Sequence, residues 1–196
     1  MSINSGMPAA PVIRPTALAH VVFRTADLDT MVNYWTTFLG GYLSHHNETL
    51  AFIRYDDEHH RIAIIRAPGT TKHDPTAAGM HHVAFTFNTL HDLVRAYEQR
   101  KKHSILPKRC VNHGPTTSMY YEDPDGNTIE TQVDNFDTAE EAAEFMAGPL
   151  FAENPIGTDF TPDELIARLK SGEDEKSIKK RIEIGPRGLP SEYSRQ

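Results

Sequence analysis

The sequence has little of what marks a secreted, membrane-bound or nucleic-acid-binding protein. Its single cysteine, Cys110, cannot form an internal disulfide, which excludes a disulfide-stapled secreted scaffold. No apolar run approaches the roughly 20 residues that cross a bilayer, and residues 1–15 show no charged segment leading into an apolar one, as a secretory signal would. With 20 Lys and Arg against 27 Asp and Glu, the net charge of −7 lacks the basic footprint of a nucleic-acid binder. We therefore expect a cytoplasmic protein with neither nucleic acid nor membrane as a partner.

Histidine is the residue type that stands out in the composition. The chain has 196 residues, 38% of them hydrophobic, which suits one globular domain of ordinary size. It contains 11 histidines. Because histidine is the commonest metal ligand and the usual acid–base group at neutral pH, their positions are the first place to look for chemistry.

A pattern of strand, helix and short strands occurs twice along the chain. The first copy predicts a strand over 17–24, a helix over 27–39 that stops at Gly40 and Gly41, and strands over 42–45, 50–55 and 61–66. After a polar linker over 68–80, the second copy predicts a strand over 81–87, a helix capped by Asn88, and strands over 104–107, 116–122 and 128–133. The two copies are offset by 62 residues when His20 is aligned with His82. Each copy is too small to bury a core alone, so we expect the two to pack together.

These elements predict an α+β fold made of paired βαβββ modules. We expect an N-terminal arm over 1–15, one domain over 16–135 with modules at 16–67 and 80–135, and a C-terminal helical extension over 136–196. Short helices are predicted over 138–146 and 163–169, the second with Thr161 as its N-cap. The sequence leaves open whether the remaining tail packs on the domain, joins another subunit or is partly disordered.

Three residues in the two modules are candidate metal ligands. His20 and His82 occupy equivalent positions in the first strand of each module, and pseudo-two-fold symmetry would bring them together. Each alone could be a hydrogen-bonded core histidine, but a shared metal would give both a partner. Glu130 follows a strong turn signal, and if it faces inward it needs a cation. His81 should point to the opposite face of its strand, so we assign it no ligand role.

The paired units, the histidine that opens each, and the segment DPDGNTIE at 123–130 resemble the vicinal oxygen chelate superfamily. That superfamily includes glyoxalase I, fosfomycin-resistance enzymes, bleomycin-binding proteins and type I extradiol dioxygenases. The resemblance covers about residues 18–134 and implies a metal centre formed by His20, His82 and Glu130. The last strand of the first module has no carboxylate where glyoxalase-like members use a fourth ligand. Two histidines and one carboxylate leave coordination positions open, which suits non-haem Fe(II) and oxygen chemistry.

Two further segments resemble the extradiol dioxygenases in particular. His59-His60-Arg61-Ile62 resembles the segment that holds the catalytic acid–base, and this maps the role onto His60. The run from Val111 to Glu130 resembles the extradiol signature, which maps an active-site histidine onto His113 and an active-site tyrosine onto Tyr120. Without the resemblance, each of these residues could equally be a turn, loop or strand residue with structural hydrogen bonds.

The resemblance implies an Fe(II)-dependent oxidoreductase that inserts O2 into a catechol-type aromatic diol, with a bicyclic diol such as 2,3-dihydroxybiphenyl as a candidate substrate. The alternatives are a lyase or isomerase of the same superfamily that uses Mn, Zn or Ni, and a non-catalytic small-molecule-binding member. The three candidate ligands argue against the last. Related folds commonly pair, so we expect a homo-oligomer.

Overall fold

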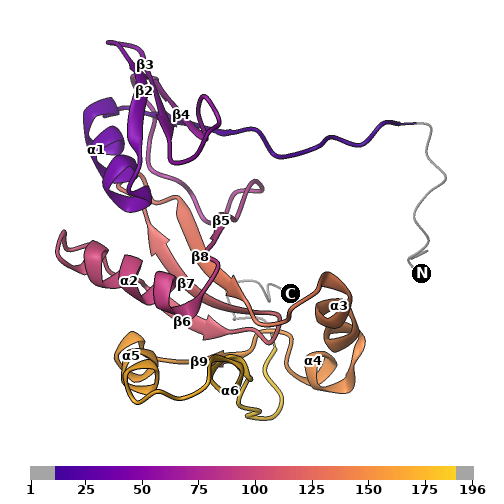
Figure 1. The fold of residues 1–196 in the computed structure, drawn as a ribbon. Coiled ribbons are helices and arrows are strands. Elements are labelled where there is room, and N and C mark those ends of the chain that lie inside the picture. Colours follow the sequence, from indigo (N-terminus) through magenta and orange to yellow (C-terminus); the bar gives the residue numbers. More distant parts are fainter. Residues whose placement is uncertain (1–11, 189–196) are drawn as a thin grey trace.

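Two βαβββ units and a C-terminal extension make up the protein in the computed structural model, which describes residues 12–188 (Figure 1). The first unit contains β1 (Val21–Thr25), α1 (Leu28–Leu39), β2 (Tyr42–His46), β3 (Leu50–Arg54) and β4 (Ile62–Arg66). The second contains β5 (His82–Thr86), α2 (Leu90–Lys101), β6 (Arg109–Asn112), β7 (Thr116–Glu122) and β8 (Thr128–Asp134). The predicted α+β fold of paired modules is confirmed.

Each unit forms its own sheet, with the same arrangement of strands. The first sheet has the order β1-β4-β3-β2, and the second has the order β5-β8-β7-β6-β9, in which β9 (Thr158–Asp159) comes from the extension. In both units the first and last strands run parallel, so that β1 pairs with β4 and β5 pairs with β8. This shared topology is the structural form of the repeat that the sequence predicts.

Local signals in the sequence explain where α1 begins and ends. The Asp27 carboxylate accepts a hydrogen bond from the Thr30 backbone N–H at 3.1 Å, as an N-cap should. Gly40 takes the left-handed conformation, with φ of 61°, that ends many helices. Between these ends one face of the helix is buried, and each fully buried large apolar side chain on it contributes about 1.5–3 kcal/mol to stability. The buried residues are Leu28, Met31, Val32, Trp35 and Phe38.

Two sequence predictions in the second unit are wrong by a few residues. The N-cap of α2 is Thr89 and not Asn88, because the Thr89 hydroxyl accepts from the Asp92 N–H at 3.0 Å. The strand predicted over 104–107 is absent, and β6 occupies Arg109–Asn112 instead. Ser104 has a positive φ of 61°, which a strand does not accommodate, and Pro107 has no N–H to donate to a sheet.

The two units are joined by contacts between α1 and the second unit. Trp35 of α1 donates from Nε1 to the Asp123 carboxylate at 3.3 Å, in the turn before β8. Arg100 of α2 donates from Nε to the Phe38 carbonyl at 2.8 Å, and its guanidinium lies 3.8 Å from the centre of the Phe38 ring. The last turn of α1 has no basic residue of its own, so Arg100 provides the positive charge that its carbonyls favour. These ties fix the first unit against α2 and against the turn that leads into β8.

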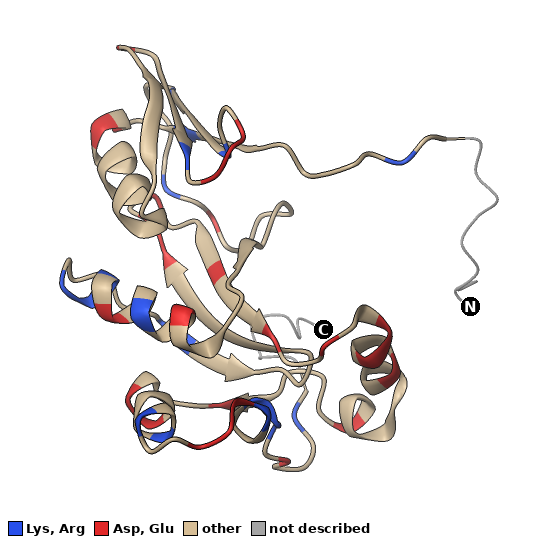
Figure 2. Cartoon of the chain, in the orientation of Figure 1, with Lys and Arg blue, Asp and Glu red and all other residues tan. Residues whose placement is uncertain are grey.

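The extension adds α3 (Ala139–Ala147), α4 (Pro149–Glu153), β9, α5 (Pro162–Lys170) and α6 (Glu175–Lys179) beside the second sheet (Figure 1). Both predicted helices are present, and a capping box begins α3 at Thr138 and α5 at Thr161. Figure 2 shows both acidic and basic residues on α2 and α5, while α3 carries acidic residues alone. Within residues 12–188, no helix is long and apolar enough to cross a membrane.

Candidate metal and active site

The second sheet brings His82 and Glu130 together. In the parallel pair of β5 and β8, Ala84 is the register partner of Glu130, and His82 lies two residues before Ala84 on the same face. The His82 Nε2 and Glu130 Oε2 atoms are 2.9 Å apart. Two ligand atoms that each lie about 2.1 Å from one divalent ion, roughly at right angles, are separated by about 3 Å. The pair therefore matches the spacing and the donor chemistry of two adjacent metal ligands.

Glu130 is a buried carboxylate that keeps its charge. Only 5% of the residue is exposed. Burial alone would raise the pKa of its carboxyl, but hydrogen bonds from His82, Ser118 and Tyr120 together hold that pKa below its ordinary value. An ionised carboxylate in a buried position is the kind of group that binds a cation.

Tyr120 and His113 extend this cluster across the sheet. Tyr120 of β7 is the register partner of Glu130, and its hydroxyl is hydrogen-bonded to that carboxylate. The same hydroxyl lies 2.8 Å from His113 Nε2. Burial raises the pKa of Tyr120, and the charge of Glu130 adds to that effect, so the phenol keeps its proton. Burial lowers the pKa of His113, against the opposing effect of its bond to the Ile156 carbonyl.

The first unit holds a separate pair of histidines, His20 and His60, whose ring centres are 4.3 Å apart. His20 is exposed and directly precedes β1. His60 is 7% exposed and stacks on Phe52 with ring centres 4.4 Å apart, and its buried Nδ1 has no hydrogen-bond partner within residues 12–188. Burial lowers the pKa of His60, and the neighbouring His20 lowers it further. His60 is therefore a neutral imidazole with an unused ring nitrogen, as a general base awaiting a substrate would be.

The six predicted site residues thus fall into two groups. His82, Glu130, Tyr120 and His113 form one contiguous cluster, and His20 and His60 form another. Among residues 12–188, no three His, Cys, Asp or Glu side chains are arranged to hold one metal ion. Two of the three predicted ligands converge, and the third, His20, does not reach them. His20 and β5 nevertheless line one hollow of about 260 Å³ between the units.

Several residues around the second cluster escaped the sequence prediction. Ser118 hydrogen-bonds Glu130, and strand alternation would have placed it on the face of Tyr120. The Arg109 guanidinium lies 5.4 Å from the centre of the Tyr120 ring, but β6 was not expected at that position. His81 directly precedes β5, so strand alternation does not turn it away, and its Nδ1 lies 2.6 Å from the Nδ1 of His82.

Comparison of the sequence with known proteins assigns the chain to a family. The model for the Glyoxalase/Bleomycin resistance protein/Dioxygenase superfamily matches residues 17–131. The chain is 44% identical over 155 residues to biphenyl-2,3-diol 1,2-dioxygenase 2 of Rhodococcus globerulus. The aligned region is 79% of this chain and 82% of that protein. It is 40% identical over 163 residues to biphenyl-2,3-diol 1,2-dioxygenase 3 of the same organism. Here the aligned region is 82% of this chain and 86% of the relative.

The fold is also found among solved structures. A glyoxylase/bleomycin resistance protein/dioxygenase domain from Frankia sp. EAN1pec superposes with a TM-score of 0.53 and 17% identity, over 65% of this chain and 98% of that one. At this identity the likeness supports the fold alone. With the family match over residues 17–131 and the identities of 44% and 40%, the chain belongs to the glyoxalase/bleomycin resistance protein/dioxygenase superfamily, as its repeated βαβββ units predicted.

Proposed function

We propose that the protein is an extradiol ring-cleaving dioxygenase that inserts O2 into a catechol-type substrate and uses Fe(II). One observation carries the proposal: the His82 and Glu130 donor atoms lie 2.9 Å apart on one sheet face, beside the hydrogen-bonded pair of Tyr120 and His113. The two Rhodococcus relatives, both biphenyl-2,3-diol 1,2-dioxygenases, support the same reaction class. A bicyclic diol of the 2,3-dihydroxybiphenyl type is therefore the substrate we expect.

The metal would be held by His82 and Glu130, and His20 of the first unit, which does not reach them in this structure, would have to move toward them to complete the set. Imidazole nitrogen and carboxylate oxygen are donors that Fe(II) accepts, and Mn, Zn and Ni use them as well. When bound, the ion supplies a Lewis acid and a template that orients two adjacent substrate oxygens beside O2. His20 would come from the first unit, next to the hollow that it shares with β5.

The remaining residues act on protons and on orientation. A catechol must lose at least one hydroxyl proton to bind a metal ion through both oxygens, and the buried, neutral His60 is the base that takes it. The Tyr120 hydroxyl keeps its own proton and is placed to hydrogen-bond a substrate oxygen beside Glu130. His113 lies behind Tyr120 and accepts or returns a proton through that hydroxyl. We also propose that the enzyme is cytoplasmic and forms a homo-oligomer. Light scattering would measure the oligomeric state.

The decisive experiment is anaerobic metal loading followed by an oxygen-electrode assay. Full-length protein purified without oxygen is loaded in parallel with Fe(II), Mn, Zn or Ni and mixed with substituted catechols and 2,3-dihydroxybiphenyl. The proposal expects oxygen uptake and a new yellow ring-opened product with Fe(II). A protein that binds iron yet consumes no oxygen with any of these diols would overturn the reaction, and turnover with another metal alone would overturn the choice of iron.

A further inference from the structure

The C-terminal extension lies directly against His113. Its strand β9 adds to the sheet edge formed by β6, with Val111 paired to Asp159 and Asn112 paired to Thr158. His113 is the next residue after β6, so the chain just before β9 runs beside it. The Ile156 carbonyl oxygen lies 2.5 Å from His113 Nδ1. The family model ends at residue 131, so this contact comes from a part of the chain that the match does not include.

A tight turn holds the Ile156 carbonyl in place. The Asn154 side chain accepts from the Gly157 N–H at 2.7 Å and donates to the Gly157 carbonyl at 3.2 Å, and Asn154 is 1% exposed. Gly157 has a φ of 102°, and a Cβ there would lie 2.2 Å from the Asn112 carbonyl oxygen and 2.7 Å from the His113 Cα. Only glycine permits this approach of the two backbones. The turn is therefore built to lie against β6 and His113.

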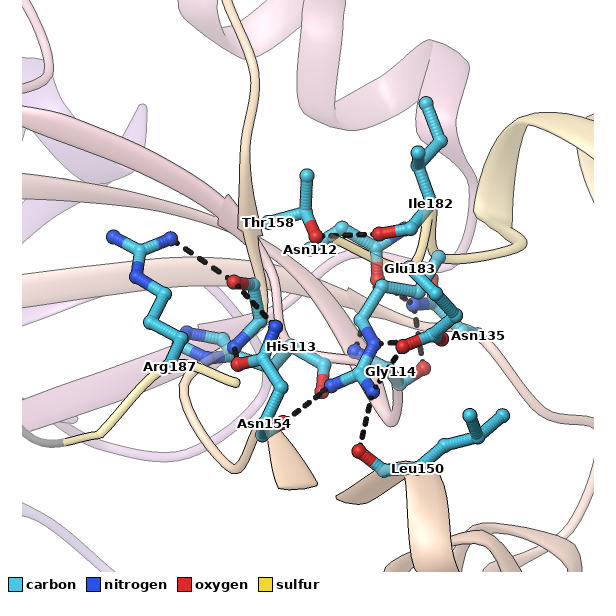
Figure 3. Close-up of polar contacts among 12 residues, drawn as sticks. Asn112, His113, Gly114, Asn135, Leu150, Asn154, Thr158, Ile182, Glu183 and Arg187 are labelled. Carbon is cyan, nitrogen blue, oxygen red and sulfur yellow. Dashed lines mark hydrogen bonds and ion pairs between the residues drawn. The ribbon is translucent and has the colours of Figure 1, made fainter. Parts of the chain in front are cut away.

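Arg181 ties this turn to the backbone of His113, and Figure 3 labels three of its partners, Leu150, Asn154 and Glu183. A guanidinium has five N–H donors in a planar fork, and here each has an acceptor. Nη1 donates to the carbonyls of Asn154 at 2.7 Å and His113 at 3.2 Å, and Nη2 donates to the Leu150 carbonyl at 3.0 Å. Nε and Nη2 share the Glu183 carboxylate at 3.0 and 2.8 Å. The Arg181 side chain is 1% exposed, so a buried guanidinium joins the extension to the backbone of His113, and Glu183 of the same extension balances its charge.

The bond to Ile156 determines which nitrogen of His113 carries the proton. A carbonyl oxygen can only accept, so Nδ1 must be the donor, and in the neutral imidazole Nε2 is then a bare acceptor. Nε2 is the nitrogen that faces the Tyr120 hydroxyl, whose single proton then has two acceptors within reach, Nε2 and the Glu130 carboxylate, and serves one of them at a time. The other tautomer would place an N–H against Tyr120 and leave Nδ1 without a proton for the carbonyl.

We propose that the Asn154–Gly157 turn and Arg181 are positioning elements that fix the tautomer and the orientation of His113, so that its Nε2 accepts a proton by way of Tyr120. The consequence for turnover rests on the proposed function, whereas the tautomer does not. Arg181 acts through the backbone of the turn and of His113 and touches neither the substrate nor the metal.

The first test is ¹⁵N NMR of histidine side chains in the full-length, metal-free chain near pH 7.5. The His113 signals are identified by their loss in His113→Gln. We expect Nδ1 to be protonated and Nε2 to be unprotonated in the wild-type protein. A wild-type spectrum with the proton on Nε2 would overturn the proposal, whatever the activity.

The second test replaces Arg181 by lysine, which keeps the charge but has too few donors for these acceptors and lacks the planar fork. We expect mixed tautomers for His113. In the iron-loaded enzyme we expect a kcat about 5–10-fold lower, because one hydrogen bond of ordinary strength corresponds to about that factor. KM should change less than about twofold. Arg168→Lys is the matched control, because Arg168 makes a similar bidentate pair with Glu173 in the same extension, and it should change neither.

A folded Arg181→Lys protein with a single, unchanged His113 tautomer and unchanged kcat would refute the positioning role. If that variant does not fold, as circular dichroism would show, Asn154→Asp decides instead, because it keeps the acceptor for the Gly157 N–H and loses the donor to its carbonyl. Wild-type protein with the expected tautomer but no oxygen uptake would refute the proposed function and leave this inference standing.

Discussion

The two βαβββ units place equivalent histidines in opposite surroundings. In the second unit, the register of β5 and β8 pairs Ala84 with Glu130, and His82 meets that carboxylate at 2.9 Å. In the first unit, the corresponding register of β1 and β4 pairs Val22 with Ala63. A methyl group therefore occupies the place of the carboxylate, and His20 has no anion in its own unit.

This difference shows how a repeated scaffold divides its chemistry. The second unit contributes a fixed negative charge together with Tyr120 and His113, whereas the first contributes His60, a buried imidazole kept neutral by its surroundings. The two roles need opposite environments. A carboxylate that holds a cation must stay charged, which hydrogen bonds favour, whereas a base that takes a proton must stay neutral, which burial favours. The same topology provides both, since the side chains that face each histidine differ.

The largest expected effect comes from removing the carboxylate of the second unit. We predict that Glu130→Gln loses bound metal and that oxygen uptake falls at least about 100-fold, since losing only an outer partner of a metal ligand costs about 10–100-fold. Metal content after anaerobic loading and dialysis is the measurement. Glu122→Gln is the control, because Glu122 is exposed on β7 and its carboxylate lies 3.8 Å from the Lys108 Nζ atom. Unchanged metal content in Glu130→Gln would mean that the carboxylate ligand is misplaced.

A smaller effect should follow in the first unit. We predict that His60→Ala keeps its metal and loses about 100-fold in turnover, the lower range of what a positioned acid–base contributes. Stopped-flow oxygen consumption, with metal content measured on the same samples, separates the two roles. His59→Ala serves as the comparison, because His59 is its exposed neighbour. Full turnover in His60→Ala would remove the proposed base while the metal site stands.

The tie between the units should have a measurable but modest energy. In Trp35→Phe, the indole donor to Asp123 is lost and a buried ring becomes smaller, while Asp123 keeps its bond from the Asn127 side chain at 2.8 Å. We predict a decrease of about 1–2 kcal/mol in the free energy of unfolding. Urea titration followed by circular dichroism measures it, with Tyr42→Phe, an exposed aromatic of the first unit, as the control. A stability equal to that of the wild type would show that this contact does not hold the units together.

The parts of the fold that follow local rules were predictable from the sequence. The helix after Asp27 has its cap, its apolar stripe and its terminal glycine, and it spans Leu28–Leu39 as the periodicity indicates. The convergence of His82 and Glu130 also follows from strand alternation once the repeat is recognised. β6 was missed because its four residues, Arg109–Asn112, carry no clear alternation and follow a proline.

The environment of His113 could not be predicted in the same way. Its partner is the main-chain carbonyl of Ile156, and a carbonyl is present at every residue, so the sequence gives no signal for it. In the sequence, Arg181 cannot be told from the other charged residues of the charged tail, although the whole residue is only 6% exposed in the structure. Contacts of this kind depend on where the chain returns to the sheet, which local patterns do not encode.

The smallest expected effect is a pH dependence of stability that originates in His113. Burial lowers its pKa in the folded protein, whereas the unfolded chain has the ordinary value of 6.5, so the unfolded state binds more protons below that pH. The contribution of His113 to stability is therefore complete above about pH 6.5 and is lost as the pH falls through the lowered pKa. Besides burial, the Ile156 carbonyl and Glu130 raise the pKa of His113, and Arg109 and His82 lower it. We predict that metal-free wild-type protein loses more stability between pH 7.5 and 5.5 than His113→Gln does, as urea titrations at each pH would show, and equal losses would place the titrating group elsewhere.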